Sequence, residues 1–529
     1  MSPAEKAHRR RWWTMLVLSL SLLVISLDNT ILNVALPSLS SDLGASASEL
    51  QWIVDAYTLV FAGMLLAAGS LSDRYGRKKA LYLGMTIFGI GSLASSVAGT
   101  ANHLIGTRAV MGFGAAFIMP ATLSILTNVF PPRERGRAIG IWAAMAGVGV
   151  PLGPILGGAL LEHFSWGSIF LVNIPIIVAA MVSGFFLLPE SSTPEASPLD
   201  PIGVVLSIGG LVALVYATIE APTRGWTSTT TLGIYVAAAL LLLAFCAWEM
   251  RDRRPMLDLH LFENKRFTAA ALAVGLVFFA LFGSLFVLTQ YLQDVLGYSP
   301  LGAGIRLLPA AIGIMIGAPA SSRIAERIGD KIPVAFGLAM AAAGLWLLST
   351  ASVSSGYTLV LAALLLFSGG MGIAMTPATN AIMGGVPRGN AGIGAAINDT
   401  TRQVGGAFGV AVIGSILATQ YRGSLSGRLE GVPAQAAVAA RSSVGAAVRI
   451  ADQVGGAGGV ALKVSADRAF IGAMDNAFFL GATVALASSL LVLLFLPAYG
   501  PEAMEAREEA AGSEPAGRRQ AALGRACRS

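Results

Sequence analysis

The sequence predicts an all-α integral membrane protein, and three observations support that fold class. Hydrophobic residues make up 55% of the 529 residues and charged residues only 12%, which is too few polar side chains to cover a soluble globule of this size. Apolar runs of about 20 residues recur along the chain, and this length crosses a hydrocarbon core of about 30 Å. The connections between them are short, and many are rich in Lys and Arg. The chain is therefore expected to lie in a bilayer.

The connection at residues 69–79 sets the expected topology. It joins two apolar runs and contains Gly69, Asp73, Gly76 and four cations, which are Arg74, Arg77, Lys78 and Lys79. Because Lys and Arg in short loops remain on the cytoplasmic side, this connection is expected there. Asp73 could bind the N-terminal end of the next helix or an arginine, which would make the connection a latch. The alternative is a simple basic anchor with a turn glycine.

The spans can be placed in order from the apolar runs. The first follows a basic N-terminal segment and passes Asp28 towards Pro37 without an apparent cleavage site, so it is expected to be an uncleaved helix with a cytoplasmic N-terminus. The later spans are expected near residues 50–69, 80–99, 104–127, 137–161, 169–188, 202–219, 230–249, 268–290, 302–321, 332–350, 358–382, 393–418 and 472–496. This is about fourteen helices, and an even number returns the C-terminal tail to the cytoplasm.

An internal repeat predicts how these helices are grouped. The run from Asp73 to Lys78 is echoed from Glu326 to Lys331 as acid-Arg-x-Gly-x-Lys, at an offset of 326 − 73 = 253 residues. Eight expected helices separate the two copies instead of six, which predicts two parallel six-helix bundles with an inserted helix pair between them. The expected units are residues 1–190, the inserted pair in 191–266, residues 267–500, and a disordered tail at 501–529. Within the third unit, residues 420–470 are expected to form short amphipathic helices on the outer surface.

Ionisable residues inside the spans are the first candidates for function, because a bilayer makes each of them costly. Asp28, Asp55 and Arg108 are expected at similar depths in the first bundle. An arginine that moves between carboxylates could switch them between holding and releasing a proton, whereas a static salt bridge would only fix the helix register. In the second bundle, Asp399 and Arg402 are one turn apart and are expected to form a local ion pair. Arg306 could either snorkel to the headgroups or take part in transport.

Two further patterns lie on single helices. Gly149, Gly153 and Gly157 repeat every four residues, beside Pro154 and Gly158, so this helix is expected to pack closely against another and to bend. Packing alone is the alternative. On another helix, Phe278, Phe282 and Phe286 form a stripe that could either line a substrate cavity or face lipid.

Several of these motifs together resemble a known family. The 69–79 connection resembles the loop motif of the major facilitator superfamily, and the helix with Gly149, Gly153, Pro154, Gly157 and Gly158 resembles its antiporter motif. Residues 27–37 resemble the first-helix signature of the fourteen-helix drug:proton antiporters. Trp52, Asp55 and Tyr57 resemble their second helix, and Arg108, Gly112 and Gly114 their fourth. The resemblance covers roughly residues 15–417. Asp399 departs from this resemblance, because proteins of the resembled family more often have a neutral residue at the corresponding position.

The resemblance implies the major facilitator fold and the export of lipophilic or cationic drugs in exchange for protons across the cytoplasmic membrane. A dedicated exporter of one secondary metabolite or lipid precursor is the alternative. A channel is disfavoured by the repeat, and an enzyme by the lack of an apparent nucleophile, base or metal cluster. The expected partners are the bilayer, protons and small lipophilic or cationic substrates. The protein is expected to be a monomer. No cofactor or metal is expected, and no nucleic acid, because the cations follow from membrane topology.

Overall fold

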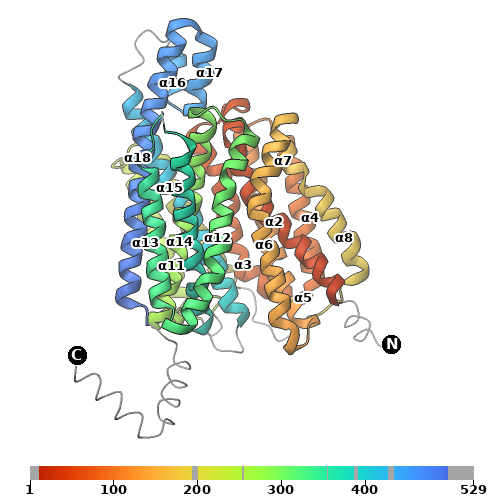
Figure 1. Cartoon of the computed structure of the whole chain (residues 1–529). Helices are drawn as coiled ribbons and strands as arrows, with labels where there is room; N and C mark the ends of the chain where they lie inside the picture. The colour runs from red at the N-terminus through yellow and green to blue at the C-terminus, as the bar shows by residue number, and fades with distance from the viewer. Residues whose placement is uncertain are drawn as a thin grey trace, which may run out of the picture.

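The chain folds into a bundle of long helices, as the computed structural model in Figure 1 shows. The structure describes residues 11–192, 200–252, 255–353, 355–385, 391–426 and 434–497, so the expected tail at 501–529 lies outside it. The long helices are α2 (Arg11–Asp42), α3 (Ala47–Tyr75), α4 (Arg77–Ser96), α5 (Ala101–Val129), α6 (Pro132–His163), α8 (Asn173–Leu187), α9 (Pro201–Arg224), α10 (Thr229–Glu249), α11 (Lys265–Gln290), α12 (Pro300–Ile328), α13 (Lys331–Leu348), α14 (Tyr357–Gly384), α15 (Ala391–Ser426) and α18 (Gly456–Phe495). The short ones are α7 (Ser168–Leu171), η1 (Leu259–Glu263), η2 (Tyr291–Val295), α16 (Ala434–Ala440) and α17 (Val444–Val454).

The all-α membrane fold is confirmed. In the described part of the chain, 12 helical segments are long and apolar enough to cross a membrane. Two more helices, α4 with 20 residues and α6 with 32, have spanning length without being among those 12, and they pack on α5 and α2. The expected count of about fourteen is therefore supported approximately.

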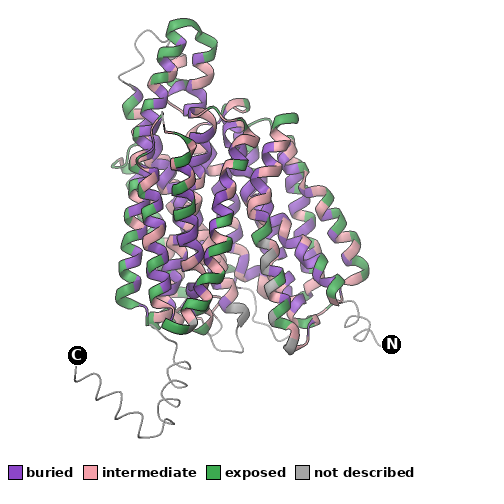
Figure 2. Cartoon of the chain, viewed as in Figure 1, coloured by how far each residue is buried: buried purple, intermediate pink, exposed green. Residues whose placement is uncertain are grey.

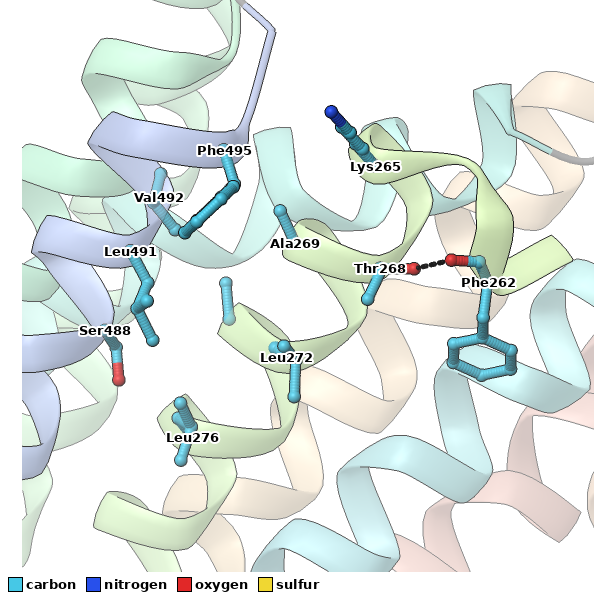
Figure 3. Close-up of a pocket in the computed structure, with 11 residues that line it drawn as sticks. Phe262, Lys265, Thr268, Ala269, Leu272, Leu276, Ser488, Leu491, Val492 and Phe495 are labelled. Atoms are coloured by element: carbon cyan, nitrogen blue, oxygen red, sulfur yellow. Dashed lines mark hydrogen bonds between the residues drawn. The ribbon is translucent and has the colours of Figure 1, made fainter.

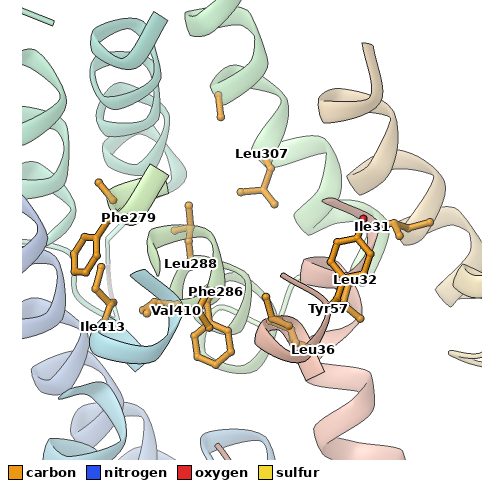
Figure 4. Packing of buried hydrophobic residues seen from close by; sticks show 14 of the residues in the cluster. Ile31, Leu32, Leu36, Tyr57, Phe279, Phe286, Leu288, Leu307, Val410 and Ile413 are labelled. Atoms are coloured by element: carbon orange, nitrogen blue, oxygen red, sulfur yellow. The ribbon is translucent and has the colours of Figure 1, made fainter. Parts of the chain in front are cut away.

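Helix pairing follows the same order in the first and last thirds of the chain. In the first set, α2 packs on α6, and α3 and α4 pack on α5. In the second set, α11 packs on α15, and α12 and α13 pack on α14. Buried apolar side chains form a continuous cluster through both sets, of which Figure 4 shows a part. Exposed residues lie along the outer faces of the bundle in Figure 2, and they include large apolar side chains such as Phe186 and Leu494 that a bilayer would cover.

The inserted helices α9 and α10 occupy one side of this arrangement. Helix α9 packs against α10 and also against α3 of the first set and α15 of the second. The Ser415 hydroxyl on α15 donates to the Thr218 carbonyl on α9 at 2.8 Å, and the rings of Trp52 and Tyr216 are 5.8 Å apart. Helix α9 therefore covers the seam between the two sets on this side.

Several helices extend beyond the expected spans, and two of these extensions concern α2 and α18. Helix α2 continues through Pro37 to Asp42, because a proline removes one helical hydrogen bond without forcing the helix to end. Asp28 thus lies 42 − 28 = 14 residues from the end of α2, which corresponds to about 21 Å along the helix. Helix α18 begins at Gly456, after Gly455 with φ +61°, and it is 40 residues long.

Within residues 420–470, short helices are present as α16 and α17. The expectation of further short helices is wrong from Gly456 onward, because no Gly or Pro interrupts the chain between Val460 and Ile471. Helices α16 and α17 project at one end of the bundle, next to the start of α18 (Figure 1). The Arg449 guanidinium on α17 donates to the Ser40 carbonyl at 2.8 Å and also to the Ser41 carbonyl, at the end of α2. We call this the cap end, and we call the other end, where α3 turns into α4, the basic end.

Candidate functional site

A buried ion pair joins two helices of the first set. Arg108 Nη1 on α5 lies 2.5 Å from Asp28 Oδ2 on α2, and the side chains are 1% and 0% exposed. The same guanidinium donates through Nε to the carbonyl of Ile53 at 3.2 Å and lies over the ring of Tyr57, 4.2 Å from its centroid. Helices α2, α3 and α5 therefore meet around one arginine. Of the expected cluster, the structure brings Asp28 and Arg108 together.

A second donor completes the site. Asn173 Nδ2, at the start of α8, donates to Asp28 Oδ1 at 3.3 Å and to the Ser92 hydroxyl on α4 at 3.1 Å. The Ser92 hydroxyl in turn donates to the carbonyl of Phe170 at 2.8 Å. Both oxygens of Asp28 are thus held by side chains from other helices. The sequence reasoning missed Asn173, although a lone amide in an apolar span could have been found by extending the search for ionisable residues to amides.

Asp55 stands apart from this pair. It is fully buried on α3, and neither of its carboxylate oxygens has a hydrogen-bond partner in the described structure. Ionising a carboxyl there would leave an unpaired charge in apolar surroundings. The expected three-member cluster is therefore a pair and a separate carboxyl group.

The glycine repeat of α6 lies against the helix that carries Asp28. A side chain at Gly149, Gly153 or Gly157 would collide with Ser26, Thr30 or Ile31 of α2. The Thr30 hydroxyl also donates to the carbonyl of Gly149 at 3.1 Å. Close packing along this stripe is therefore required by the space available.

The two sets of helices touch towards the cap end. A Cβ at Gly158 on α6 would lie 2.5 Å from the Cα of Leu301 on α12, and one at Gly304 would collide with the backbone of Pro154. Gln293 Nε2 of the second set donates to the carbonyl of Val34 on α2 at 2.8 Å. At the basic end, the ion pairs of Arg11 with Glu134 and of Arg266 with Asp330 each stay within one set.

The 69–79 connection is held by its own charges and by the chain after α8. Arg77 Nε lies 2.7 Å from Asp73 Oδ1, one turn apart. The first amides of α4 are satisfied elsewhere, because Arg77 N donates to the carbonyl of Ser191 at 2.9 Å and Lys78 N to Glu190 Oε1 at 3.1 Å. Asp73 thus pairs with an arginine, and the cap of α4 is Glu190, a residue that the sequence reasoning did not select.

Two glycines of the connection are placed differently, and Arg74 lies beside the ring of the adjacent tyrosine. Gly76 has φ +122°, which L side chains rarely adopt, and a Cβ on it would lie 2.9 Å from Glu190 Oε1. At Gly69 a Cβ would make an ordinary contact with Pro120 at 3.5 Å. Arg74 lies over the ring of Tyr75, 5.6 Å from its centroid. Gly76 is therefore the position where the backbone requires glycine.

The corresponding turn of the second set is similar in backbone and different in pairing. Gly329 there has φ +83°, and the ion pair is made by Asp330 with Arg266 at the start of α11. Burial raises the pKa of Asp330, while the guanidinium of Arg266 lowers it. Asp330 therefore ties this turn to α11, whereas Asp73 pairs with Arg77 across its own turn.

The phenylalanine stripe of α11 faces its own bundle. Phe286 is 1% exposed, and Phe278 and Phe282 are partly buried with ring centroids 6.0 Å apart. A Cβ at Gly406 on α15 would lie 2.6 Å from the ring of Phe282. Arg402, also on α15, lies 5.3 Å from the centroid of Phe278 and 3.6 Å from Asp399. The stripe thus contacts α15 of its own bundle through Phe278 and Phe282. The expected local pair of Asp399 and Arg402 is present.

A cavity of about 280 Å³ lies away from all these groups, between the start of α11 and the end of α18 (Figure 3). Its lining is mostly apolar, with the amine of Lys265 at one side and the Thr268 hydroxyl bonded to the carbonyl of Phe262 at 2.6 Å. It contains none of the polar residues described above, so it is outside the candidate site.

Two equivalent sets of membrane helices, with ionisable side chains buried inside the first of them, form the architecture of a secondary transporter. Comparison with known families identifies the particular group. The profile of the Major Facilitator Superfamily matches residues 18–410, and the chain belongs to this superfamily.

Similar proteins and structures agree with this assignment. The chain is 36% identical over 484 residues to the multidrug efflux pump LfrA of Mycolicibacterium smegmatis, covering 91% of this chain and 96% of that protein. It is 34% identical over 420 residues to the tetracenomycin C resistance and export protein of Streptomyces glaucescens, covering 79% and 78%. It is 34% identical over 493 residues to the methyl viologen resistance protein SmvA of Salmonella typhimurium, covering 92% and 97%.

Among solved structures, a bacterial homolog of the human lysosomal transporter Spinster, inward-facing and unoccupied, matches with a TM-score of 0.66 at 18% identity, over 93% of this chain and 99% of that one. A D-xylose-proton symporter matches with a TM-score of 0.60 at 14% identity, over 92% and 98%. These two structures support the fold alone.

Proposed function

We propose that this protein is a proton-coupled antiporter that exports lipophilic or cationic small molecules across the cytoplasmic membrane by alternating access. The observation that carries the proposal is the ion pair of Asp28 and Arg108, buried among four helices of one set. An ion pair with only a structural role would cost less free energy at the bundle surface. A buried pair instead gives a carboxylate whose charge depends on the position of a single arginine. Protonation of Asp28 would release Arg108, and movement of Arg108 would in turn favour protonation.

Asp55 supplies a second group for the same chemistry. In the described part of the chain no cation or hydrogen-bond donor reaches its carboxylate oxygens, so the form that costs least is the protonated one. A change that brings Arg108 or water to Asp55 would favour its ionisation and the release of a proton. The two carboxyl groups therefore favour opposite charge states in one conformation, which suits a carrier that exchanges protons for substrate.

The glycine stripe and the end contacts support alternating access. The two sets of helices meet near the cap end, at Gly158 with Leu301 and at Gly304 with Pro154, as expected for a state that opens towards the basic end. The cations of the connections support a cytoplasmic location for the basic end and for both termini. The two sets and the inserted pair would act as one monomeric unit driven by the proton gradient, without a cofactor.

The names of the relatives support export as the direction of transport. LfrA is a multidrug efflux pump, and SmvA is a resistance protein for methyl viologen. A second candidate function, the export of one secondary metabolite, is favoured by the similarity to the tetracenomycin C export protein.

Inside-out vesicles from an efflux-deficient bacterium test the proposal. Vesicles with the protein should accumulate ethidium only while a proton gradient is present, and a panel of neutral and cationic compounds should show several substrates. Transport of one compound alone would favour the dedicated exporter. Collapse of the gradient without accumulation of any compound would indicate a channel and contradict antiport.

A further inference from the structure

The geometry of the second set points to a binding subsite for an organic cation, formed by the Asp399 carboxylate and the face of Phe278, which the side chain of Arg402 occupies when no substrate is bound. This inference rests on the proposed export function and names a substrate class and a place for it. The ligand would be a molecule with a delocalised or quaternary positive charge on an apolar body.

The contacts of Arg402 are those that such a cation would make. Its guanidinium carbon lies 5.3 Å from the centroid of the Phe278 ring, within the range of a cation–π contact. Arg402 Nη1 lies 3.6 Å from Asp399 Oδ1, and Nη2 lies 3.4 Å from the Thr379 hydroxyl on α14. One carboxylate, one aromatic face and one hydroxyl from three helices, α15, α11 and α14, thus surround a single positive group.

The pair of Arg402 and Asp399 is loose in comparison with the pair of Arg108 and Asp28. Charge-assisted hydrogen bonds to carboxylates are about 2.7–2.9 Å long, so a separation of 3.6 Å is longer than such a bond. Arg402 Nε is also buried without a hydrogen-bond partner in the described structure. In contrast, Arg108 is held by Asp28 at 2.5 Å and by the carbonyl of Ile53. Arg402 can therefore leave its position at a smaller cost than Arg108.

Access also distinguishes the two pairs. The side chains of Arg402 and Asp399 are 24% and 15% exposed, whereas those of Arg108 and Asp28 are 1% and 0% exposed. The neighbouring rings of Phe278 and Phe282, tilted by 36°, offer a wider apolar surface next to the charge. A flat cation could therefore reach Asp399, stack on Phe278 and displace a guanidinium that carries the same charge.

Two variants give opposite expectations for the affinity of a permanent cation. The probe is ethidium, whose binding to purified protein in detergent is followed by fluorescence. Arg402→Gln removes the competing cation, so the Kd should fall about three- to tenfold. Asp399→Asn removes the counter-charge, so the Kd should rise about tenfold or more. Each variant should bind the neutral dye N-phenyl-1-naphthylamine as the unmodified protein does.

Arg306 provides a matched control. It also lies over an aromatic ring of the second set, 3.7 Å from the centroid of Tyr298, but towards the cap end of α12. Arg306→Gln should leave the Kd of ethidium unchanged. A third variant, Phe278→Leu, should weaken ethidium binding without removing a charge, which tests the subsite if Asp399→Asn does not fold.

The outcomes separate this subsite from the general function. An unchanged or higher Kd in Arg402→Gln, with the fold intact by thermal melting, would overturn the subsite while proton-driven export of ethidium by the unmodified protein still stood. Loss of export in the unmodified protein would instead overturn the proposed function.

Discussion

Arg108 reaches Asp28 from another helix, and the 2.5 Å separation of Nη1 and Oδ2 is made where both side chains are shielded from solvent. The pair forms one unit with Asn173, which holds the second oxygen of Asp28 at 3.3 Å. Loss of either charge leaves the other buried and uncompensated, which costs about 3–5 kcal/mol in proteins. Under the proposed function, proton coupling would depend on the same two residues as stability, so experiments have to separate these two effects.

Asp28→Asn should abolish proton-driven efflux and lower the thermal stability of the protein in detergent. The double variant Asp28→Asn/Arg108→Gln removes both charges and should recover most of the stability, because no isolated charge remains. It should remain inactive in vesicles. If the double variant transports as well as the unmodified protein, the pair is only structural.

Arg108→Ala should prevent proton release when substrate is added, because the carboxyl group that loses its counter-charge stays protonated. Arg108→Lys keeps the charge and loses the planar fork that also reaches Ile53, so it should be impaired but active if the attraction is mainly Coulombic. A pH-sensitive dye in weakly buffered detergent solution gives the measurement. Normal proton release in Arg108→Ala would make Arg108 a structural residue.

Asp55→Asn breaks no hydrogen bond in the described structure, since neither carboxylate oxygen has a hydrogen-bond partner there. It should therefore destabilise the protein less than Asp28→Asn does. Exchange of labelled for unlabelled substrate should persist, while accumulation against a gradient should be lost, because exchange needs no net proton movement. Accumulation at the unmodified level would remove Asp55 from the coupling scheme.

Gly153→Ala should reduce transport about tenfold or more, because the added methyl group collides with Thr30 on α2 and overpacking costs about 1–3 kcal/mol. Adding Thr30→Ala should restore part of the activity by removing the atoms that collide. Gly147→Ala is the control, since a Cβ at Gly147 has nothing within 4 Å. Equal losses in both alanine variants would show that the effect is not one of packing.

Gly76→Ala should slow turnover more than it weakens substrate binding, because the substitution strains the connection at the basic end and leaves the helices around Arg108 intact. The positive φ costs about 1–2 kcal/mol for a side chain, and the new methyl group approaches Glu190. Gly106→Ala, where a Cβ meets nothing within 4 Å, is the control. Turnover number and Kd measured on the same preparations distinguish a latch from a binding role, which a pure loss of affinity would indicate.

The fold could be predicted well because the length of each apolar run and the charge of each loop are properties of consecutive residues, which do not depend on how the helices pack. The site could be predicted only in part. Matched depth makes both Asp28 and Asp55 candidate partners of Arg108. Depth does not give the rotation of a helix about its axis, and this rotation decides the partner. The capping of α4 by Glu190 could not be predicted for a related reason, since Glu190 and Lys78 are 112 positions apart in the sequence.

The position of α9 affects how fast the two sets can move. Because α9 packs on α3 and on α15, a rotation of one set relative to the other has to shear at least one of these two interfaces. The hydrogen bond from Ser415 to the Thr218 carbonyl belongs to the interface of α9 with α15. The contact between Trp52 and Tyr216 belongs to the interface of α9 with α3. The inserted helix thus adds to the activation barrier of the transition itself, and residues far from any proton or substrate can set the turnover rate.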